Sequence, residues 1–377
     1  MDIEAKLKLI KRNAEEIMTE EDMKHLLETG EKLKHYIGFE ISGKIHIGTG
    51  IMCMSKVKDF QDAGVNCSIF LADWHSWIND KLGGDLETIK KVAVNYFKEG
   101  LTASLKCVGG DPEKIKFILG SELYHNNDKY WQTMIEISKN ISLSRISRSI
   151  TIAGRKEGEA VDFAKMIYPP MQVADIFIQG LNMPHAGLDQ RKAQVIARDV
   201  ALKLKISPIK NKKGEVIKPV AVHHHLILGL KKPPVWPVPE ENLQELWSSL
   251  KMSKSIPDSA IFITDEASEI ERKINSAFCM EGEIKFNPIL DWTKHLLFRD
   301  DKFVLEIDRP EKFGGNISLE SYAELEKAFV DRKLHPMDLK KAVAREITKL
   351  LEPARKHFEQ PKFKKMKDEM EKLLITR

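Results

Sequence analysis

The first two thirds of the chain alternate between short apolar runs and longer stretches in which apolar residues recur at helical spacing. The helical spacing covers residues 46–63 and 85–105, and Gly64 closes the first of these stretches. Four apolar runs have the length and composition of buried strands: residues 36–39, 65–71, 115–119 and 219–228. Strands that alternate with helices predict βαβ units and a parallel, doubly wound sheet.

Two regions depart from this alternation. Polar and basic helical stretches replace the apolar strands over about residues 125–165, which we interpret as a helical insertion into the sheet domain. Residues 2–29 keep mostly helical spacing, and we predict one helix there that stops near Gly30. After the insertion, the pattern predicts helices over residues 168–181 and 188–204.

Beyond about residue 265 the pattern becomes almost wholly helical. The predicted helices cover residues 268–277, 288–297, 319–331, 336–352 and 361–374. This change in pattern predicts an α/β domain over residues 1–265, followed by an all-helical domain over residues 266–377.

Composition and charge narrow the class of protein. The 377 residues are enough for two or three domains, and 42% hydrophobic residues exclude a disordered chain. With 60 Lys and Arg against 56 Asp and Glu, no basic field covers the whole protein, so any nucleic acid must bind a local patch. The four cysteines form no CxxC pair, and no segment resembles a signal peptide or a membrane span. We therefore expect a cytoplasmic protein with reduced thiols.

A glycine-rich turn follows the first predicted strand and opens a helix. It reads Gly43-Lys-Ile-His46-Ile-Gly48-Thr49-Gly50. A helix N-terminus presents free backbone N–H groups to a phosphate, and glycine lets the backbone approach a nucleotide closely. Taken alone, the segment also fits an ordinary glycine turn with an exposed histidine. It is neither a dinucleotide fingerprint nor a P-loop.

Lysine and serine residues cluster in a second short segment, Lys251-Met-Ser253-Lys254-Ser255. Lysine side chains can neutralise the charge that builds up on a departing pyrophosphate, and serine hydroxyls add neutral donors. A solvated basic loop is the alternative interpretation. The complete five-residue string, however, arises rarely by chance, which favours a polyphosphate site.

Together the two segments resemble the HIGH and KMSKS motifs of the class I aminoacyl-tRNA synthetases. His46 to Thr49 matches HIGH at three positions, with Thr49 in place of the second histidine, and residues 251–255 match KMSKS completely. The resemblance implies a Rossmann-type catalytic domain and a helical anticodon-binding domain. It implies that His46, Lys251 and Lys254 act on ATP, and that Gly48, Thr49, Ser253, Ser255 and His223 bind it. Residues 231–250 form a longer lead-in to the second motif than is usual in this family.

Three further segments resemble the tyrosyl-tRNA synthetases of the archaeal and eukaryotic branch. They are Tyr36-Ile-Gly-Phe-Glu40, Tyr168-Pro-Pro-Met-Gln172-Val-Ala-Asp175 and Asp189-Gln190-Arg-Lys. The resemblance extends along nearly the whole chain. It implies that Tyr36 and Asp175 hold the phenol hydroxyl of tyrosine, and that Tyr168, Gln172 and Gln190 hold its α-ammonium group.

The residues themselves support part of this assignment. Gln172 and Asp175 are three positions apart, so they share one face of a helix. Asp189 precedes a helix, where an aspartate can equally serve only as a cap. His75 follows a predicted strand at the end where α/β sheets bind ligands, although a structural histidine is the alternative.

Three consecutive histidines, 223 to 225, resemble a metal site at first sight. Alternation along a strand sends His223 and His225 to one face and His224 to the other, which argues against three ligands on one ion. We therefore predict no protein-bound metal, and the resemblance implies that His223 lies near the nucleotide.

The resemblance also implies contacts with RNA. Arg148, with Arg145 nearby, is a candidate for the acceptor stem, Phe313 can stack on an anticodon base, and Asp338 can read a base edge. Ordinary surface or core roles are the alternatives for each of these side chains.

From these features we predict a homodimeric class I tyrosine–tRNA ligase that uses tyrosine, ATP with Mg²⁺, and tRNA(Tyr). A tryptophanyl-tRNA synthetase, a small nucleotidylyltransferase and a non-catalytic tRNA-binding relative are the alternatives.

Overall fold

The computed structural model describes residues 1–155, 160–238, 247, 250–254 and 256–373. Its main sheet has the strand order β1-β6-β5-β2-β3-β4. Strands β2 to β6 are parallel to their neighbours and only β1 is antiparallel to β6, which confirms the predicted Rossmann-type fold. The strands are β1 (Ala14–Met18), β2 (Lys34–Phe39), β3 (Asn66–Leu71), β4 (Ile115–Leu119), β5 (Met183–Gly187) and β6 (Ala221–His224).

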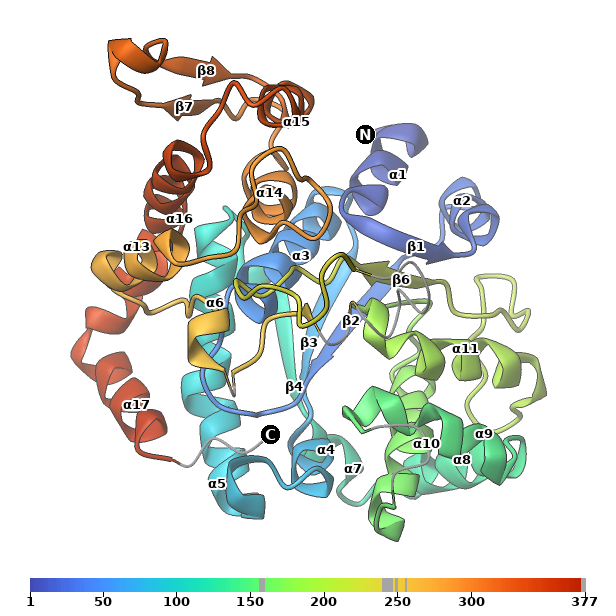
Figure 1. The fold of residues 1–377 in the computed structure, drawn as a ribbon. Coiled ribbons are helices and arrows are strands. Elements are labelled where there is room, and N and C mark those ends of the chain that lie inside the picture. Colours follow the sequence, from blue (N-terminus) through green and yellow to red (C-terminus); the bar gives the residue numbers. More distant parts are fainter. Residues whose placement is uncertain (156–159, 239–246, 248–249, 255, 374–377) are drawn as a thin grey trace.

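Helices cover both faces of the sheet (Figure 1). Helices in the first half of the chain are α1 (Ile3–Lys11), α2 (Glu20–Glu28), α3 (Cys53–Asp62), α4 (Asp73–Ile78), α5 (Leu86–Val92), α6 (Lys98–Cys107), α7 (Gly120–Tyr124), α8 (Asp128–Lys139) and α9 (Leu143–Ser149). Those in the second half are α10 (Phe163–Ile178), α11 (Arg191–Val200), α13 (Ala267–Asn275), α14 (Pro288–Trp292), α15 (Tyr322–Val330), α16 (Pro336–Glu359) and α17 (Pro361–Glu371). None of the helices in the described part of the chain is both long and apolar enough to cross a membrane.

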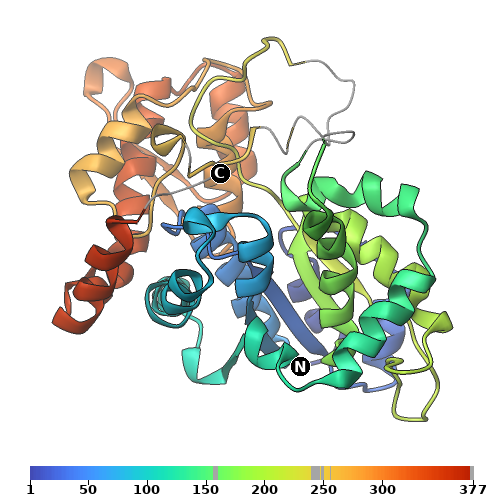
Figure 2. The same cartoon turned by 90° about the horizontal axis from the view of Figure 1, so that it is seen from below.

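Alternation along the central strands divides the core into two layers. Ile37 and Ile69 belong to the layer under α3 and α6, whereas Tyr36 and Phe70 belong to the layer under α8, α10 and α11. The helices of the C-terminal region extend the first layer, because α16 packs along α6 and its Leu351 joins the same apolar cluster. Figure 2 shows this region and the α8–α11 region on opposite sides of the sheet.

The predicted helix over residues 2–29 is wrong. Asn13 adopts a left-handed conformation with φ 52°, which ends the first helix, and the next residues form β1 at the sheet edge. Periodicity missed this strand because β1 carries charged residues among its apolar ones. It also missed β5, whose sequence Met-Pro-His-Ala-Gly holds no β-branched residue.

In the C-terminal region the predicted helices are confirmed, but the prediction that the region is all-helical is wrong. Strands β7 (Leu305–Ile307) and β8 (Ile317–Leu319) form a two-stranded antiparallel sheet where only helices were predicted. Each strand has three residues, which is too short for alternation to be seen in the sequence. The division into two domains stays a prediction.

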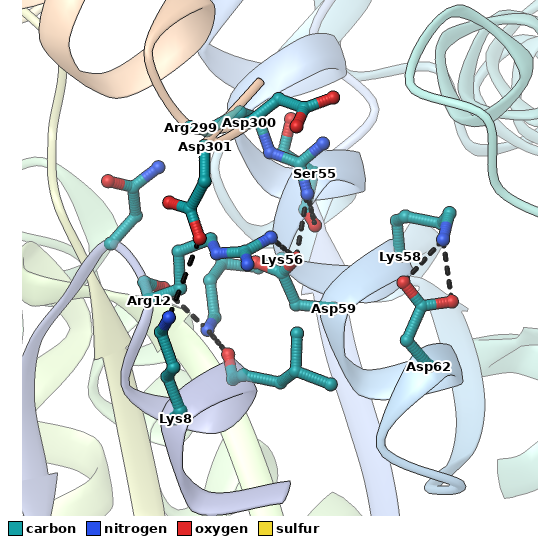
Figure 3. Close-up of polar contacts among 12 residues, drawn as sticks. Lys8, Arg12, Ser55, Lys56, Lys58, Asp59, Asp62, Arg299, Asp300 and Asp301 are labelled. Atoms are coloured by element: carbon teal, nitrogen blue, oxygen red, sulfur yellow. Dashed lines mark hydrogen bonds and ion pairs between the residues drawn. The ribbon is translucent and has the colours of Figure 1, made fainter. Parts of the chain in front are cut away.

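A buried polar cluster joins three distant segments on the α3 side of the sheet (Figure 3). Lys56 on α3 is fully buried, and its Nζ donates to carbonyl oxygens at the end of α1 at 3.2, 2.8 and 2.7 Å. One turn later, Asp59 accepts from Arg12 at 3.2 Å and from Arg299 at 2.7 Å. Burial raises the pKa of Asp59, and these cations oppose that rise. A single carboxylate therefore holds α1, α3 and the segment after α14 together.

We expect Asp59→Asn to lower the free energy of unfolding by about 3 kcal/mol, because it removes a buried carboxylate and leaves the partly buried Arg12 and Arg299 without that counter-charge. Asp62→Asn on the same helix is the matched control. Asp62 pairs with Lys58 at the surface, where such a pair contributes about 1 kcal/mol or less. Denaturant unfolding monitored by circular dichroism measures both variants, and equal losses would contradict the assigned role of Asp59.

Candidate active site

A cavity of about 480 Å³ opens at the carboxyl ends of the parallel strands. It lies where β2 and β5 are neighbours and the strand order changes direction, the position at which α/β sheets bind ligands. Most of the residues predicted from the motifs line it: Tyr36, His46, Gly48, Thr49, Tyr168, Gln172, Asp175, Gln190, Lys251 and Lys254. His75 lines it as well. Residues from five distant stretches of sequence therefore meet around one space.

Backbone pairing brings the two signature motifs together. The amide of Ile47 donates to the carbonyl of Ile261 at 2.9 Å, and the amide of Ile263 donates to the carbonyl of Ile45 at 3.0 Å. This short antiparallel bridge holds the glycine turn beside the segment that follows the KMSKS motif. Gly50 is packed so closely that a Cβ atom would lie 2.6 Å from Ser104 Oγ. Only glycine fits at that position.

A second pairing fixes the start of the KMSKS segment. Lys251 forms an isolated antiparallel bridge with Leu228, and the amide of Gly229 donates to the carbonyl of Leu250 at 2.8 Å. The long lead-in over residues 231–250 is therefore closed by backbone pairing at its base. Its length does not displace the motif from the cavity.

The substitution of Thr49 for the second histidine of the motif has a local explanation. The amide of Thr49 donates to His46 Nδ1 at 3.2 Å, and the Thr49 hydroxyl lies 3.3 Å from His46 Nε2. Nδ1 therefore accepts, and the proton of the neutral ring is on Nε2. Burial, with Lys254 and Lys251 nearby, lowers the pKa of His46 well below its usual range. His46 is thus a neutral, oriented donor at the edge of the cavity.

The two lysines of the KMSKS motif are held differently. Lys251 Nζ pairs with Asp189 at 2.5 Å, and this contact raises the pKa of Lys251. Lys254 Nζ donates to the Ser42 hydroxyl at 2.6 Å, and burial lowers the pKa of Lys254 to about 7. Asp189 therefore acts as a counter-ion in this structure, since its side chain forms no helix cap.

The other end of the cavity is lined by hydrogen-bonding groups. The Tyr168 hydroxyl donates to Glu40 at 2.9 Å, and Gln172 Nε2 donates to Gln190 Oε1 at 3.2 Å. Asp175 is 1% exposed, and this burial raises its pKa well above the usual range. Gln172 and Asp175 both face the cavity, as their spacing predicted. This end can bind a polar amino acid with a ring hydroxyl.

Sequence reasoning missed several side chains of the cavity wall. Glu40 bonds Tyr168 and lies 3.5 Å from Lys81, so it is placed at both ends of the site. A hydrogen-bonded chain links His35, His185 and His224 at 3.1 and 2.8 Å, and the last two line the cavity. No local pattern predicts this chain of histidines, because β2, β5 and β6 contribute one residue each.

Two predicted ATP-site residues, His223 and Ser253, do not line the cavity. His223 Nδ1 lies 2.9 Å from a carboxylate oxygen of Glu16 on the neighbouring strand β1, whereas His224 and His225 line the cavity. Ser253 is not among the lining residues, and Ser255 lies outside the described residues. The candidate RNA contacts Arg148, Phe313 and Asp338 are not among the residues that line the cavity, and their role stays a prediction.

His225 belongs to a separate charged network. Its two ring nitrogens lie 2.7 Å from carboxylate oxygens of Glu15 and Asp291, and these partners raise its pKa to about 9. His295 stacks on the same ring at 3.9 Å. Glu15, His225 and His295 place potential ligand atoms within 4.8 Å of one another. Because both nitrogens of His225 already bond carboxylates, the geometry is that of a charge-assisted network rather than a metal centre.

Comparison with known proteins agrees with this geometry. The family model for class I tRNA synthetases (W and Y) matches residues 28–352. A tyrosine–tRNA ligase from Thermococcus kodakarensis is 58% identical over 361 residues, covering 95% of this chain and 96% of the relative. A tyrosine–tRNA ligase from Pyrobaculum arsenaticum is 48% identical and covers 100% of both chains.

Solved structures give the same result. A tyrosyl-tRNA synthetase from Pyrococcus horikoshii, crystallised with L-tyrosine, superimposes with a TM-score of 0.94 at 53% identity, covering 98% of this chain and 100% of that one. A tryptophanyl-tRNA synthetase from Aeropyrum pernix reaches a TM-score of 0.65 at 19% identity, which shows the shared fold alone. The chain therefore belongs to the class I tRNA synthetases of the tryptophan and tyrosine family, within its tyrosyl members of archaeal type.

Proposed function

We propose that this chain activates L-tyrosine with ATP and transfers the tyrosyl group to the 3′ end of tRNA(Tyr). In the first step a carboxylate oxygen of tyrosine bonds to the α-phosphorus of ATP, and pyrophosphate leaves. In the second step a ribose hydroxyl of the tRNA bonds to the tyrosyl carbonyl, and AMP leaves. The observation that carries the proposal is the meeting of both signature motifs on one cavity that ends at Asp175.

The ATP end of the cavity catalyses by position and charge. His46 donates a hydrogen bond from Nε2 to a phosphate oxygen, which replaces its contact with the Thr49 hydroxyl. Lys251 and Lys254 stabilise the negative charge that develops on the departing pyrophosphate. Ser253 does not line the cavity in this structure, so its proposed contact depends on movement of the loop. His223 lies on strand β6 beside Glu16, outside the cavity lining, so movement of that loop does not bring it to the phosphates. No side chain has to act as a nucleophile.

Magnesium enters this proposal as part of the substrate. The lining carboxylates are Glu40, Asp175 and Asp189, and each already bonds a side chain of the protein. Within the described residues they form no convergent oxygen cage of the kind that holds a resident ion. Mg²⁺ would therefore arrive bound to the phosphates of ATP.

The other end of the cavity selects the amino acid. Asp175 and Tyr36 hold the phenol hydroxyl, and Tyr168, Gln172 and Gln190 hold the α-ammonium group. Gln172 Oε1 is buried and has no hydrogen-bond partner among the described residues, so it is available to accept from that group. A substrate without the phenol leaves Asp175 unpaired, which costs binding free energy.

Two of the proposed RNA contacts, Arg148 and Phe313, are exposed, and Asp338 is partly exposed. Arg148 is exposed, whereas its neighbour Arg145 pairs with Asp199 at 2.8 Å, which favours Arg148 for the acceptor stem. Phe313 is 60% exposed on the turn between β7 and β8. Asp338 lies in the first turn of α16. Arg309 connects the turn that carries Phe313 to the segment before α16, because its side chain donates to the carbonyl of Lys333 at 2.8 Å. A cytoplasmic location stays a prediction from the sequence.

The first prediction concerns Lys254. We expect Lys254→Ala to lower the rate of tyrosine-dependent pyrophosphate exchange by about 100-fold, because it removes a preorganised donor to the leaving group. The KM for tyrosine should change by less than about twofold. Lys213→Ala, on an exposed turn, is the matched control. Full exchange activity in Lys254→Ala would contradict the role of the loop.

The second prediction follows from the low pKa of Lys254, about 7. At pH 8 the Lys254 amine is neutral in most of the molecules. Bound phosphates raise the pKa of this amine, so the binding of ATP above pH 7 should be accompanied by the uptake of a proton. By linkage, the affinity for ATP then falls by up to about tenfold per pH unit in that range. Calorimetry in two buffers of different ionisation enthalpy measures the uptake, and Lys254→Met should abolish it. Binding at pH 8 without proton uptake would refute the linkage.

The third prediction concerns the proposed homodimer. Helices α8, α9 and α10, which pack on one another, expose Ile135, Leu143 and Phe163 by 55, 71 and 79%. Large exposed apolar side chains in one region indicate a protein interface. We expect Leu143→Asp combined with Phe163→Asp to convert the dimer to monomers in analytical ultracentrifugation. Phe313→Asp, a similarly exposed residue on the C-terminal region, should leave the sedimentation coefficient unchanged.

A further inference from the structure

Two buried side chains next to Asp175 have no role in the scheme above. Tyr124, at the end of α7, is 1% exposed, and its hydroxyl donates to Asp175 Oδ1 at 3.2 Å. His75 on α4 is 2% exposed, and its Nδ1 lies 3.4 Å from the same hydroxyl. Asp175 thus has one oxygen held by the protein itself.

The proton positions follow from the number of donors. A phenol hydroxyl has one proton, and Tyr124 gives it to Asp175, so its oxygen is left to accept from its other polar neighbours, His75 and the Tyr130 hydroxyl. The Tyr130 hydroxyl also bonds Asp175. His75 is then protonated on Nδ1 and presents a lone pair on Nε2. Burial lowers the pKa of His75 to about 3, which keeps the ring neutral.

The other ring nitrogen of His75, Nε2, faces the carboxyl of Asp175, and the ring also interacts with the backbone of Tyr168. Nε2 lies 3.8 Å from Asp175 Oδ2 and has no hydrogen-bond partner among the described residues. Both residues line the cavity. An acceptor nitrogen and a carboxyl oxygen therefore stand side by side at the amino-acid end, where one hydroxyl group of a substrate can satisfy them.

Aromatic packing makes this arrangement rigid. The Tyr124 ring contacts Trp74 at 5.2 Å and Tyr130 at 4.5 Å between centroids. Because the ring is held from both sides, the hydroxyl cannot follow Asp175 if the carboxyl rotates. Asp175 is consequently fixed with Oδ2 free for the substrate, and it cannot turn to find another partner when phenylalanine enters.

We propose that Tyr124 is a positioning residue, oriented by His75, that fixes Asp175 and so sets the preference for tyrosine over phenylalanine. The proposal rests on the assignment of Asp175 as the ligand of the phenol. Without the Tyr124 hydroxyl, Asp175 has a buried oxygen to satisfy and turns away from the substrate, which weakens tyrosine binding. Phenylalanine makes no hydrogen bond there, so its binding should change little.

The test is Tyr124→Phe in the pyrophosphate exchange assay on the full-length protein. We expect the KM for tyrosine to rise about tenfold, equivalent to about 1.4 kcal/mol. The inhibition constant of phenylalanine and the KM for ATP should change by less than about twofold. Tyr322→Phe, which removes a hydroxyl from α15 outside the cavity, is the matched control and should change none of the three values.

A structural role alone would weaken tyrosine and phenylalanine equally, and that result would overturn the proposal. Unchanged values in Tyr124→Phe would also overturn it. The variant Asp175→Asn distinguishes a wrong role for Tyr124 from a wrong amino-acid site. If Asp175 binds the phenol, Asp175→Asn raises the KM for tyrosine, and an unchanged KM in that variant would show that the assignment of Asp175 is wrong. Should Tyr124→Phe not fold, His75→Asn keeps a donor near Tyr124 but removes Nε2. It should also raise the KM for tyrosine and spare phenylalanine, and equal losses there would overturn the proposal.

Discussion

The active site depends on a short backbone bridge between two segments more than 200 residues apart in sequence. Residues 45–47 pair with residues 261–263, so the glycine turn and the end of the KMSKS segment are held as neighbouring strands would be. This pairing uses main-chain groups, so it does not depend on the charges that later meet ATP. The lysines remain available for the phosphates because other groups supply the structural contacts.

The two ends of the cavity differ in charge. At the ATP end, Lys251 is charged and held by Asp189, whereas Lys254 is buried with a lowered pKa and bonds a serine hydroxyl rather than a carboxylate among the described residues. A triphosphate supplies the missing negative charge. At the amino-acid end, burial favours the neutral forms of Asp175 and His75, and selection there depends on hydrogen bonds.

The sequence predicted this arrangement where its information is local. Both signature motifs are continuous strings, and the spacing of Gln172 and Asp175 placed them correctly on one helix face. Prediction failed where a feature depends on pairing between distant strands. The neighbours of β6 decide that His224, and not His223, lines the cavity, and no pattern within three histidines contains that register. Tyr124 was missed for the same reason, since its role follows only from its contact with α10.

The C-terminal region takes part in the active site through packing. Glu371 on α17 pairs with Lys44, two residues before His46, at 2.7 Å. Phe358 on α16 lies 5.5 Å from the ring of Tyr96, whose hydroxyl accepts from the amide of Ile45 at 3.4 Å. An exposed ion pair of this kind contributes little energy alone, but the buried ring contact is not screened by solvent. The segment that carries the phosphate-binding turn is therefore supported from the same helices that continue the apolar core. A displacement of those helices on binding RNA would reach His46 through two contacts, without passing through the sheet.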